Sequence, residues 1–363
     1  MMECQEGKRD EIRQHIVVIG AGVVGISTGL NLVQEGFHVT IVARDFPAPF
    51  ETISVDQINY TSPWAGAHCR FIPPTNETEK REHEMALLTF RHMERLVKDG
   101  KQAEAGIRFM KGVEYVERPP QAYLDLTEAK AAELGYKSFR RLDKTELPAN
   151  VEWGAEYQTF CLNPMMYCAF LLRNFARLGG KIQKKVLQCP QEVFDMPEFR
   201  GIAAVVNCSG FGFDDPAVIP NRGQLVIVAN DCDVTITRQN KDGSWVVAIP
   251  RGYDGGTVVG GTREPGVLDT VPDPLKSKQM LKNLKETHPQ ILPEGQDFKV
   301  LREVVGRRPM REGGPRVEYE VVDRNPKKAL VHAYGLGGRG YECSWGVAAA
   351  VKDLLDQFAQ DVG

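Results

Sequence analysis

The sequence lacks any long hydrophobic run and any strong excess of one charge. No segment approaches the roughly 20 consecutive apolar residues that a membrane-spanning helix needs. The 45 Lys and Arg residues nearly balance the 48 Asp and Glu residues, which gives a net charge of −3. Proteins that bind nucleic acids or anionic membranes concentrate positive charge instead. We therefore expect neither a nucleic-acid partner nor a membrane partner.

The eight cysteines show no clustering in the sequence. No two of them form a C-x-x-C motif, and no Cys/His spacing is typical of a metal site. The sequence therefore predicts no metal and reduced, buried cysteines of an intracellular protein. The first 15 residues are too polar for a secretory signal. The last three, Asp361, Val362 and Gly363, differ from a Ser-Lys-Leu peroxisomal address.

A glycine-rich turn follows the first apolar run of the chain. Ile16–Ile19 predict a strand, Val23–Gly36 a helix and Val39–Val42 a second strand. In such a unit glycines permit a tight turn, close approach to a pyrophosphate and close packing of helix on strand. The sequence therefore predicts dinucleotide binding by Gly20, Ala21, Gly22, Val23, Val24 and Gly25.

The end of the second predicted strand bears on which dinucleotide binds. Arg44 and Asp45 follow Ala43. An acidic residue in this region binds a ribose hydroxyl, whereas an arginine accommodates the 2′-phosphate of NADP. The residues alone leave both FAD and NADP open.

The remaining pattern predicts two interleaved domains. A length of 363 residues corresponds to about two domains. Strand patterns at 205–207 and 329–332 resume the α/β character, whereas residues 224–262 are typical of an antiparallel sheet. We predict α/β plus antiparallel β: a Rossmann-like dinucleotide-binding domain (1–75, 160–223 and 325–363) interleaved with a mixed α+β substrate domain (76–159 and 224–324).

Seven short motifs occur in an order found in a known family. They are residues 20–25 (Gly-Ala-Gly-Val-Val-Gly), 43–45 (Ala-Arg-Asp), 62–67 (Ser-Pro-Trp-Ala-Gly-Ala), 222–224 (Arg-Gly-Gln), 260–262 (Gly-Gly-Thr), 306–309 (Gly-Arg-Arg-Pro) and 332–335 (His-Ala-Tyr-Gly). Together they resemble the FAD-dependent D-amino-acid oxidases and D-aspartate oxidases, especially fungal ones. The resemblance implies FAD, hydride transfer from a D-amino acid, reoxidation by O2 and a peroxisomal location. Whether the protein forms a homo-oligomer stays an open question.

The resemblance also implies which residues contact the cofactor. The glycine turn would hold the pyrophosphate, and Arg44 and Asp45 would meet the adenosine end, where Val186 would contact the adenine through its backbone. Backbone groups near the flavin would come from residues 62–67 and from the turn at 335–340. The implied cofactor-binding residues outside the glycine turn are Arg44, Asp45, Ser62, Trp64, Ala65, Gly66, Ala67, Val186, Ser209, Gly210, Gly335, Gly337, Gly338, Arg339 and Gly340.

An arginine is the side chain best suited to hold a substrate carboxylate, because its planar fork donates two parallel hydrogen bonds. The resemblance assigns this role to Arg308 rather than to Arg307, and it gives the Gly338 carbonyl to the substrate amine. Family members place a tyrosine where this chain has Val247. We expect Trp245, on the same strand face, to fill that space, with Tyr253 or Tyr341 as candidates for the missing hydroxyl.

Two further arginines suggest an acidic substrate. Arg263 follows the Gly-Gly-Thr motif, as in D-aspartate oxidases, and Arg238 lies near the position of a mobile arginine in those enzymes. We therefore expect D-aspartate and D-glutamate to be favoured, with no side chain acting as a general acid or base. The alternatives are an oxidase that prefers neutral D-amino acids, an NADP-dependent reductase and a non-catalytic dinucleotide-binding protein.

Overall fold

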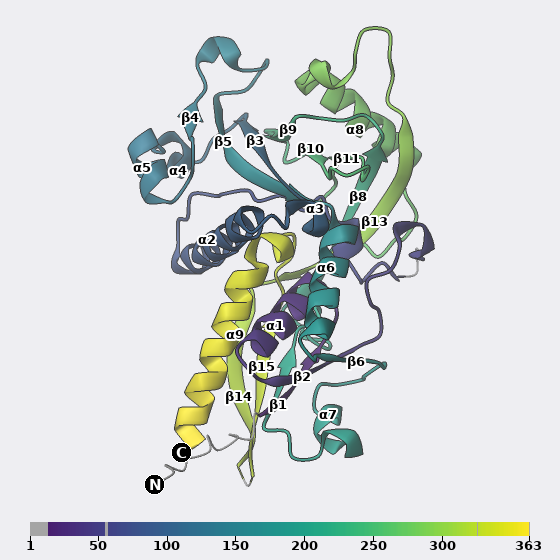
Figure 1. Ribbon diagram of the computed structural model, residues 1–363. Helices are drawn as coiled ribbons and strands as arrows, with labels where there is room; N and C mark the ends of the chain where they lie inside the picture. The colour runs from purple at the N-terminus through teal and green to yellow at the C-terminus, as the bar shows by residue number, and fades with distance from the viewer. Residues whose placement is uncertain (1–13, 55–56, 325, 363) are drawn as a thin grey trace, which may run out of the picture.

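Two β-sheets organise the chain (Figure 1). The computed structural model describes residues 14–54, 57–324 and 326–362, so Cys4 lies outside the described residues. In this part of the chain, one sheet has the strand order β14-β15-β7-β1-β2-β6. The other has the order β12-β8-β11-β10-β9-β3-β5-β4, with β13 paired to β8.

The first sheet is built on parallel strands, as the glycine motif predicts. β1 pairs in parallel with β2 and β7, β7 with β15, and β2 with β6, whereas β14 is antiparallel to β15. The strands are β1 (His15–Ile19), β2 (His38–Ala43), β6 (Lys181–Lys184), β7 (Ala204–Asn207), β14 (Arg316–Arg324) and β15 (Lys327–Tyr334).

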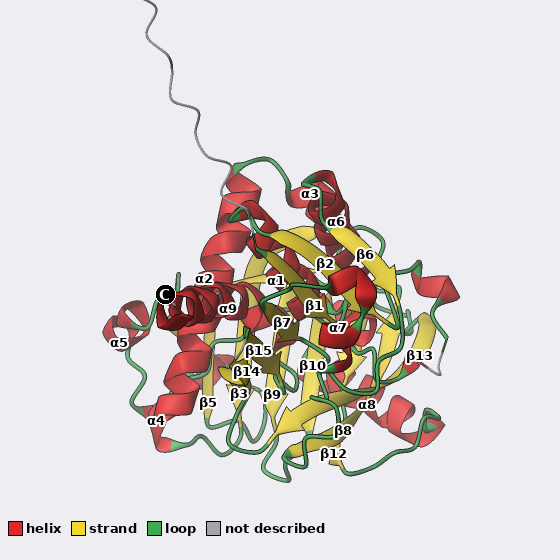
Figure 2. Ribbon diagram, turned by 90° about the horizontal axis from the view of Figure 1, so that it is seen from below, coloured by secondary structure: helices red, strands yellow, loops and turns green. Residues whose placement is uncertain are grey.

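Helices cover both faces of this sheet (Figure 2). Ile16 and Val18 point into the core beneath α1 (Val23–Gln34), α6 (Pro164–Arg177) and α9 (Gly340–Val362). Val17 and Ile19 point to the opposite side, where α7 (Glu192–Asp195) packs. Alternate side chains of a strand face opposite sides, so a continuous apolar run is what a strand covered on both faces requires.

The second sheet is largely antiparallel, as predicted for residues 224–262, and turns at 242–243 and 255–256 join β9 to β10 and β10 to β11. Its strands are β3 (Ile107–Val116), β4 (Arg140–Arg141), β5 (Trp153–Leu162), β8 (Val218–Val228), β9 (Val234–Gln239), β10 (Trp245–Pro250), β11 (Thr257–Gly260), β12 (Glu264–Pro265) and β13 (Val300–Arg311). Further helices are α2 (Glu77–Lys98), α3 (Gln102–Ala105), α4 (Gln121–Leu124), α5 (Glu128–Glu133) and α8 (Pro274–Thr287).

The predicted fold class is confirmed, with a difference in detail. β14 falls within the predicted substrate-domain range 224–324 but pairs with β15 of the first sheet. The division into domains stays a prediction. Six of the seven described cysteines are buried, and none of the seven is in a disulfide. None of the described helices has the length and apolarity to cross a membrane.

Two half-buried histidines have strongly lowered pKa values. The ring of His92 stacks on Trp345, with centroids 3.5 Å apart, and Nδ1 of His68 is buried without a hydrogen-bond partner. Burial, with smaller contributions from Arg95 and Arg70 respectively, lowers the pKa of each histidine to about 3. Burial also lowers the pKa values of His15, His83, His288 and His332.

We predict that the protein loses stability as the pH falls below about 6.5. The unfolded chain binds protons near the ordinary histidine pKa of about 6.5, whereas folded His68 and His92 stay neutral until about pH 3. Each lowers the free energy of unfolding by up to about 1.4 kcal/mol per pH unit in that window. Urea unfolding at pH 7, 6 and 5 measures the slope, and His92→Gln should reduce it. An equal slope in this variant would contradict the prediction.

Candidate active site

The predicted cofactor segments meet at one edge of the first sheet. β1, β2, β7 and β15 are linked through parallel pairings, so the turns that follow them lie at the same edge. The nitrogen of Gly335 donates to the Gly210 oxygen at 3.1 Å, which joins the turn after β15 to the turn after β7. In open α/β sheets, ligands bind in the crevice outside the carboxyl ends of the strands.

The glycine turn before α1 leaves room only for glycine at its two ends. Gly20 has a φ of +102°, and a Cβ on Gly25 would lie 2.0 Å from the Gly20 oxygen. Gly22 caps α1 without a side-chain hydrogen bond. The helix therefore presents backbone at its N-terminus, where the helix dipole favours negative charge.

A second helix N-terminus lies beside the first. α9 begins at Gly340, whose Cβ, if it had one, would be 3.5 Å from Val23 Cγ1. The side chain of Arg339, just before α9, is directed to protein carboxylates: Nη1 donates to Glu82 at 2.6 Å and Nε to Glu342 at 2.7 Å. Its guanidinium thus links α2 to α9. The backbone of Arg339 is the part of this residue that remains for the predicted cofactor contact.

The segment 62–67 is held between the two sheets. Ser62 Oγ accepts a hydrogen bond of 3.0 Å from the Val23 nitrogen at the start of α1. From the second sheet, buried Arg251 donates to the backbone oxygens of Pro63 at 3.2 Å and Ala65 at 2.7 Å. Sequence reasoning missed Arg251, because nothing near the end of β10 marks it as a link between sheets.

The residues predicted to meet the adenosine end lie together after β2. Asp45 accepts hydrogen bonds from Arg44 Nε at 2.7 Å and from Gln57 Nε2 at 2.9 Å. The Lys185 nitrogen donates to the Ala43 oxygen at 2.9 Å, which brings the neighbouring Val186, 59% exposed, to this end of the edge. These positions suit polar contacts to a ribose and an apolar contact to a base.

Arg308 lies flat against β8 of the second sheet. A Cβ on Gly223 would lie 2.2 Å from its Nη1, so the guanidinium needs a glycine beneath it. Nη1 donates to the Thr262 oxygen at 3.1 Å, and Cδ is 3.6 Å from the position of a Cβ on Gly338. Burial lowers the pKa of Arg308. The loop after β15 of the first sheet therefore reaches the arginine of the second.

The turn that carries Arg263 is fixed from β8. The Gln224 nitrogen donates to Thr262 Oγ1 at 2.9 Å. Buried Arg222 forms an ion pair with Glu264, the residue that follows Arg263. The Arg-Gly-Gln and Gly-Gly-Thr motifs, far apart in the sequence, are thus one structural unit that positions Arg263.

Arg263 and Arg70 both lie over the ring of Trp245. The guanidinium carbons are 3.7 Å and 4.7 Å from the ring centroid, respectively. Arg263 is exposed when the whole residue is considered. Its pKa is nevertheless lowered to about 10, because protein atoms surround its guanidinium and because Arg70 and Arg308 carry positive charges nearby. Three cations and one indole therefore converge.

Only one of these three cations has a protein counter-charge. Arg70 Nε donates to Glu114 at 2.8 Å and Nη2 to the Tyr123 hydroxyl at 2.7 Å. Among the described residues, neither Arg308 nor Arg263 has a carboxylate within the 4.0 Å of an ion pair. Sequence reasoning missed Arg70, because Arg70 belongs to no recognisable motif. The site can therefore receive two anionic groups.

The structure places Arg238 away from this group. Its Nη2 contacts Glu117 at 2.5 Å and the Ala149 oxygen at 3.0 Å. Arg238 pairs with Val246, whereas Trp245 pairs with Gln239. Strand alternation therefore puts Arg238 on the other face of the sheet from Trp245, and we leave it out of the candidate site.

Neither candidate tyrosine offers a free hydroxyl in place of the one absent at Val247. The Tyr253 hydroxyl donates to the Ile107 oxygen at 3.1 Å, and the Tyr341 hydroxyl donates to the Ser62 oxygen at 2.9 Å. Val247 packs against the apolar cluster that contains Ile249. Trp245 and the arginines are therefore the polar and aromatic groups left at the predicted substrate end.

Comparison with known proteins gives consistent matches along most of the chain. Residues 15–354 match a family described as FAD dependent oxidoreductase (DAO). The chain is 41% identical to a D-aspartate oxidase of Talaromyces thermophilus, with 94% of both chains covered, and 32% identical to a D-amino-acid oxidase of Schizosaccharomyces pombe, with 92% of this chain and 93% of the relative covered. Glycine oxidase from Geobacillus kaustophilus has a similar structure, with a TM-score of 0.70, 18% identity and 95% of both chains covered.

Proposed function

This chain belongs to the DAO family of FAD-dependent oxidoreductases, and on that premise we propose that it oxidatively deaminates D-amino acids and favours D-aspartate and D-glutamate. The overall reaction converts a D-amino acid, O2 and water to a 2-oxo acid, ammonia and hydrogen peroxide. The observation that carries the preference is the pair of guanidinium groups, of Arg308 and Arg263, without a carboxylate partner among the described residues.

The residues at the edge of the first sheet fit FAD. The backbone of the glycine turn and the N-terminus of α1 would hold the pyrophosphate, and Asp45 would meet the ribose. Residues 62–67 and the turn before α9 would flank the flavin. When bound, the flavin would be the acceptor of the two electrons. Family membership thus settles the choice, left open by Arg44 and Asp45, in favour of FAD.

Each arginine has a distinct substrate group to bind. Arg308, fixed over Gly223 and beside Gly338, would receive the α-carboxylate on its fork. Arg263 would receive the side-chain carboxylate while its guanidinium stays on the Trp245 ring. A carboxylate is costly to remove from water unless a cation receives it, so an acidic substrate gains where a neutral one does not.

The same cations prepare the substrate amine for oxidation. Nearby positive charge favours the neutral form of an amine and so lowers its pKa. Arg308 and Arg263 therefore favour loss of the ammonium proton to solvent, and the Gly338 carbonyl would orient the resulting amine. The neutral amine then has a free lone pair, and its α-carbon is held in place. We therefore propose that no side chain acts as a general base.

A neutral-substrate oxidase is the second candidate, because Arg263 is exposed and Trp245 only half-buried. If Arg263 turned to solvent, Trp245 and Val247 would offer apolar surface to a neutral side chain. The experiment with Arg263 below distinguishes these two cases.

We predict that Arg308→Ala retains FAD but lowers kcat/KM about 10²- to 10⁴-fold, because loss of one partner from a buried charged pair costs about 3–5 kcal/mol. Steady-state kinetics and the flavin content measure the two effects. Arg307→Ala is the control: its Nη2 contacts the Leu268 oxygen, and it should retain nearly full activity. An Arg308→Ala variant as active as the wild type would exclude the clamp.

We predict that the wild type favours D-aspartate and that Arg263→Leu lowers the ratio of kcat/KM for D-aspartate to that for D-alanine about 10- to 100-fold, because a hydrogen bond to a charged group contributes about 1.5–3 kcal/mol. Arg238→Lys, which keeps a cation beside Glu117, is the control and should preserve the ratio. An unchanged ratio in Arg263→Leu, or a wild type that favours D-alanine, supports the neutral-substrate oxidase.

A further inference from the structure

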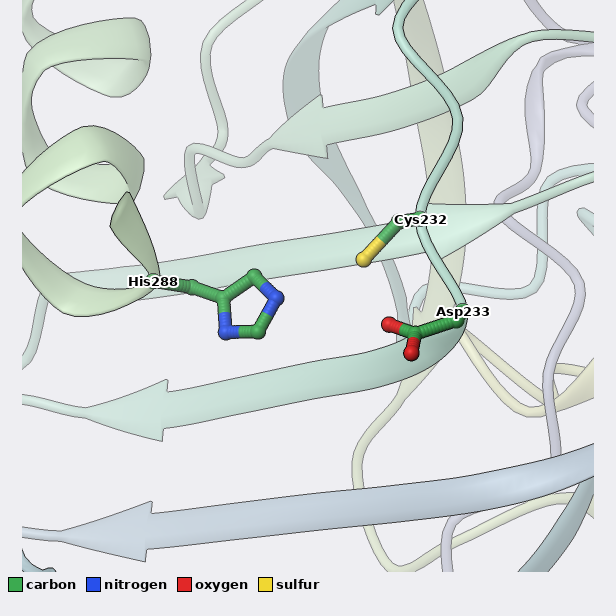
Figure 3. Close-up of side chains that lie close together, drawn as sticks. All are labelled: Cys232, Asp233 and His288. Atoms are coloured by element: carbon green, nitrogen blue, oxygen red, sulfur yellow. The ribbon is translucent and has the colours of Figure 1, made fainter. Parts of the chain in front are cut away.

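Cys232, Asp233 and His288 form a cluster that the proposed function does not use (Figure 3). Cys232 and Asp233 lie in the loop between β8 and β9, and His288 follows the last residue of α8. Their thiol, carboxylate and imidazole ligand atoms lie within 4.8 Å of one another. Figure 3 shows the imidazole on one side of a gap and the sulfur and carboxylate on the other.

The donor atoms of this cluster are available for a ligand. Within the described chain, neither His288 nor Asp233 makes a side-chain hydrogen bond or ion pair, and Cys232 Sγ donates one hydrogen bond, to the Val234 oxygen at 3.1 Å. Because no described protein group engages the ring nitrogens of His288, its imidazole can offer a lone pair to a ligand.

We propose that Cys232, Asp233 and His288 bind one zinc ion, with water as the fourth ligand. Ligand distances of about 2.3 Å to sulfur and about 2.0–2.2 Å to nitrogen or oxygen place tetrahedral ligand atoms roughly 3.3–3.7 Å apart, so modest side-chain rotations close the site. Binding replaces the S–H bond by a Zn–S bond, and the proton leaves to solvent. A thiolate and an imidazole select zinc over Mg²⁺ and Ca²⁺, which prefer oxygen ligands.

The cluster rests on a well-packed base. Cys232 is 4% exposed and packs in the same apolar cluster as Met280 and Leu284 of α8. The His288 nitrogen donates to the Leu284 oxygen at 2.8 Å, which fixes the end of the helix. Zinc would therefore link the end of α8 to the start of β9. The sequence predicted no metal because Cys232 and His288 are distant along the chain.

The site is tested on the FAD-loaded enzyme after treatment with a chelator. We expect equilibrium dialysis against Zn²⁺ to give one bound zinc, X-ray absorption to show one sulfur ligand, and the midpoint of thermal unfolding to rise because zinc binds the folded state. Excess Mg²⁺ or Ca²⁺ should not compete. Failure to bind zinc, or bound zinc without a sulfur ligand, would overturn the proposal.

Single substitutions identify the ligands. Cys232→Ser, Asp233→Asn and His288→Asn should each weaken zinc binding by at least about tenfold, the smallest effect typical of losing even an outer-shell partner. Cys189→Ser changes a half-buried cysteine outside the cluster and should bind as the wild type does. If Cys232→Ser does not fold, His288→Asn and Asp233→Asn decide, because neither residue is buried. Wild-type affinity in these variants would disprove the site.

Discussion

Positive charge without a protein counter-charge is the constraint on which the substrate end of this enzyme depends. Positive charges held close together are costly unless anions join them, and neither Arg308 nor Arg263 has a carboxylate partner among the described residues. The surrounding structure serves to hold them in place: Gly223 admits the Arg308 guanidinium, and Arg222 and Gln224 fix the turn that carries Arg263. An anionic substrate would offset the electrostatic cost of holding these cations together in the protein without substrate.

The two sheets bring this charged group to the cofactor edge. Arg251 of the second sheet holds the segment 62–67 against the start of α1. The Gly337 nitrogen donates to the Pro309 oxygen at 2.8 Å, which ties the turn before α9 to the strand of Arg308. The proposed carboxylate clamp and the predicted flavin contacts are therefore held by the same short connections, so the distance between a bound substrate and the cofactor would depend on both sheets at once.

Local signals in the sequence identified more of the fold than of the site. The glycine turn, its strands and the antiparallel region between β8 and β11 follow from patterns within short windows. Contacts between distant residues could not be predicted from such short windows. The strand register puts Arg238 on the face opposite Trp245, and Arg70 reaches Trp245 from another part of the chain. Cys232 and His288 meet only because α8 ends beside the β8–β9 loop.

Anaerobic reduction of the bound flavin tests most directly whether two cations receive a D-dicarboxylate. The FAD-loaded enzyme is titrated without oxygen with D-aspartate, L-aspartate or D-alanine while the visible flavin absorbance is followed. We expect bleaching by D-aspartate at concentrations at least about tenfold below those of D-alanine, the gain from one charge-assisted hydrogen bond, and none by L-aspartate. Bleaching by D-alanine at lower concentrations than by D-aspartate would contradict the assignment of Arg263 to the side-chain carboxylate.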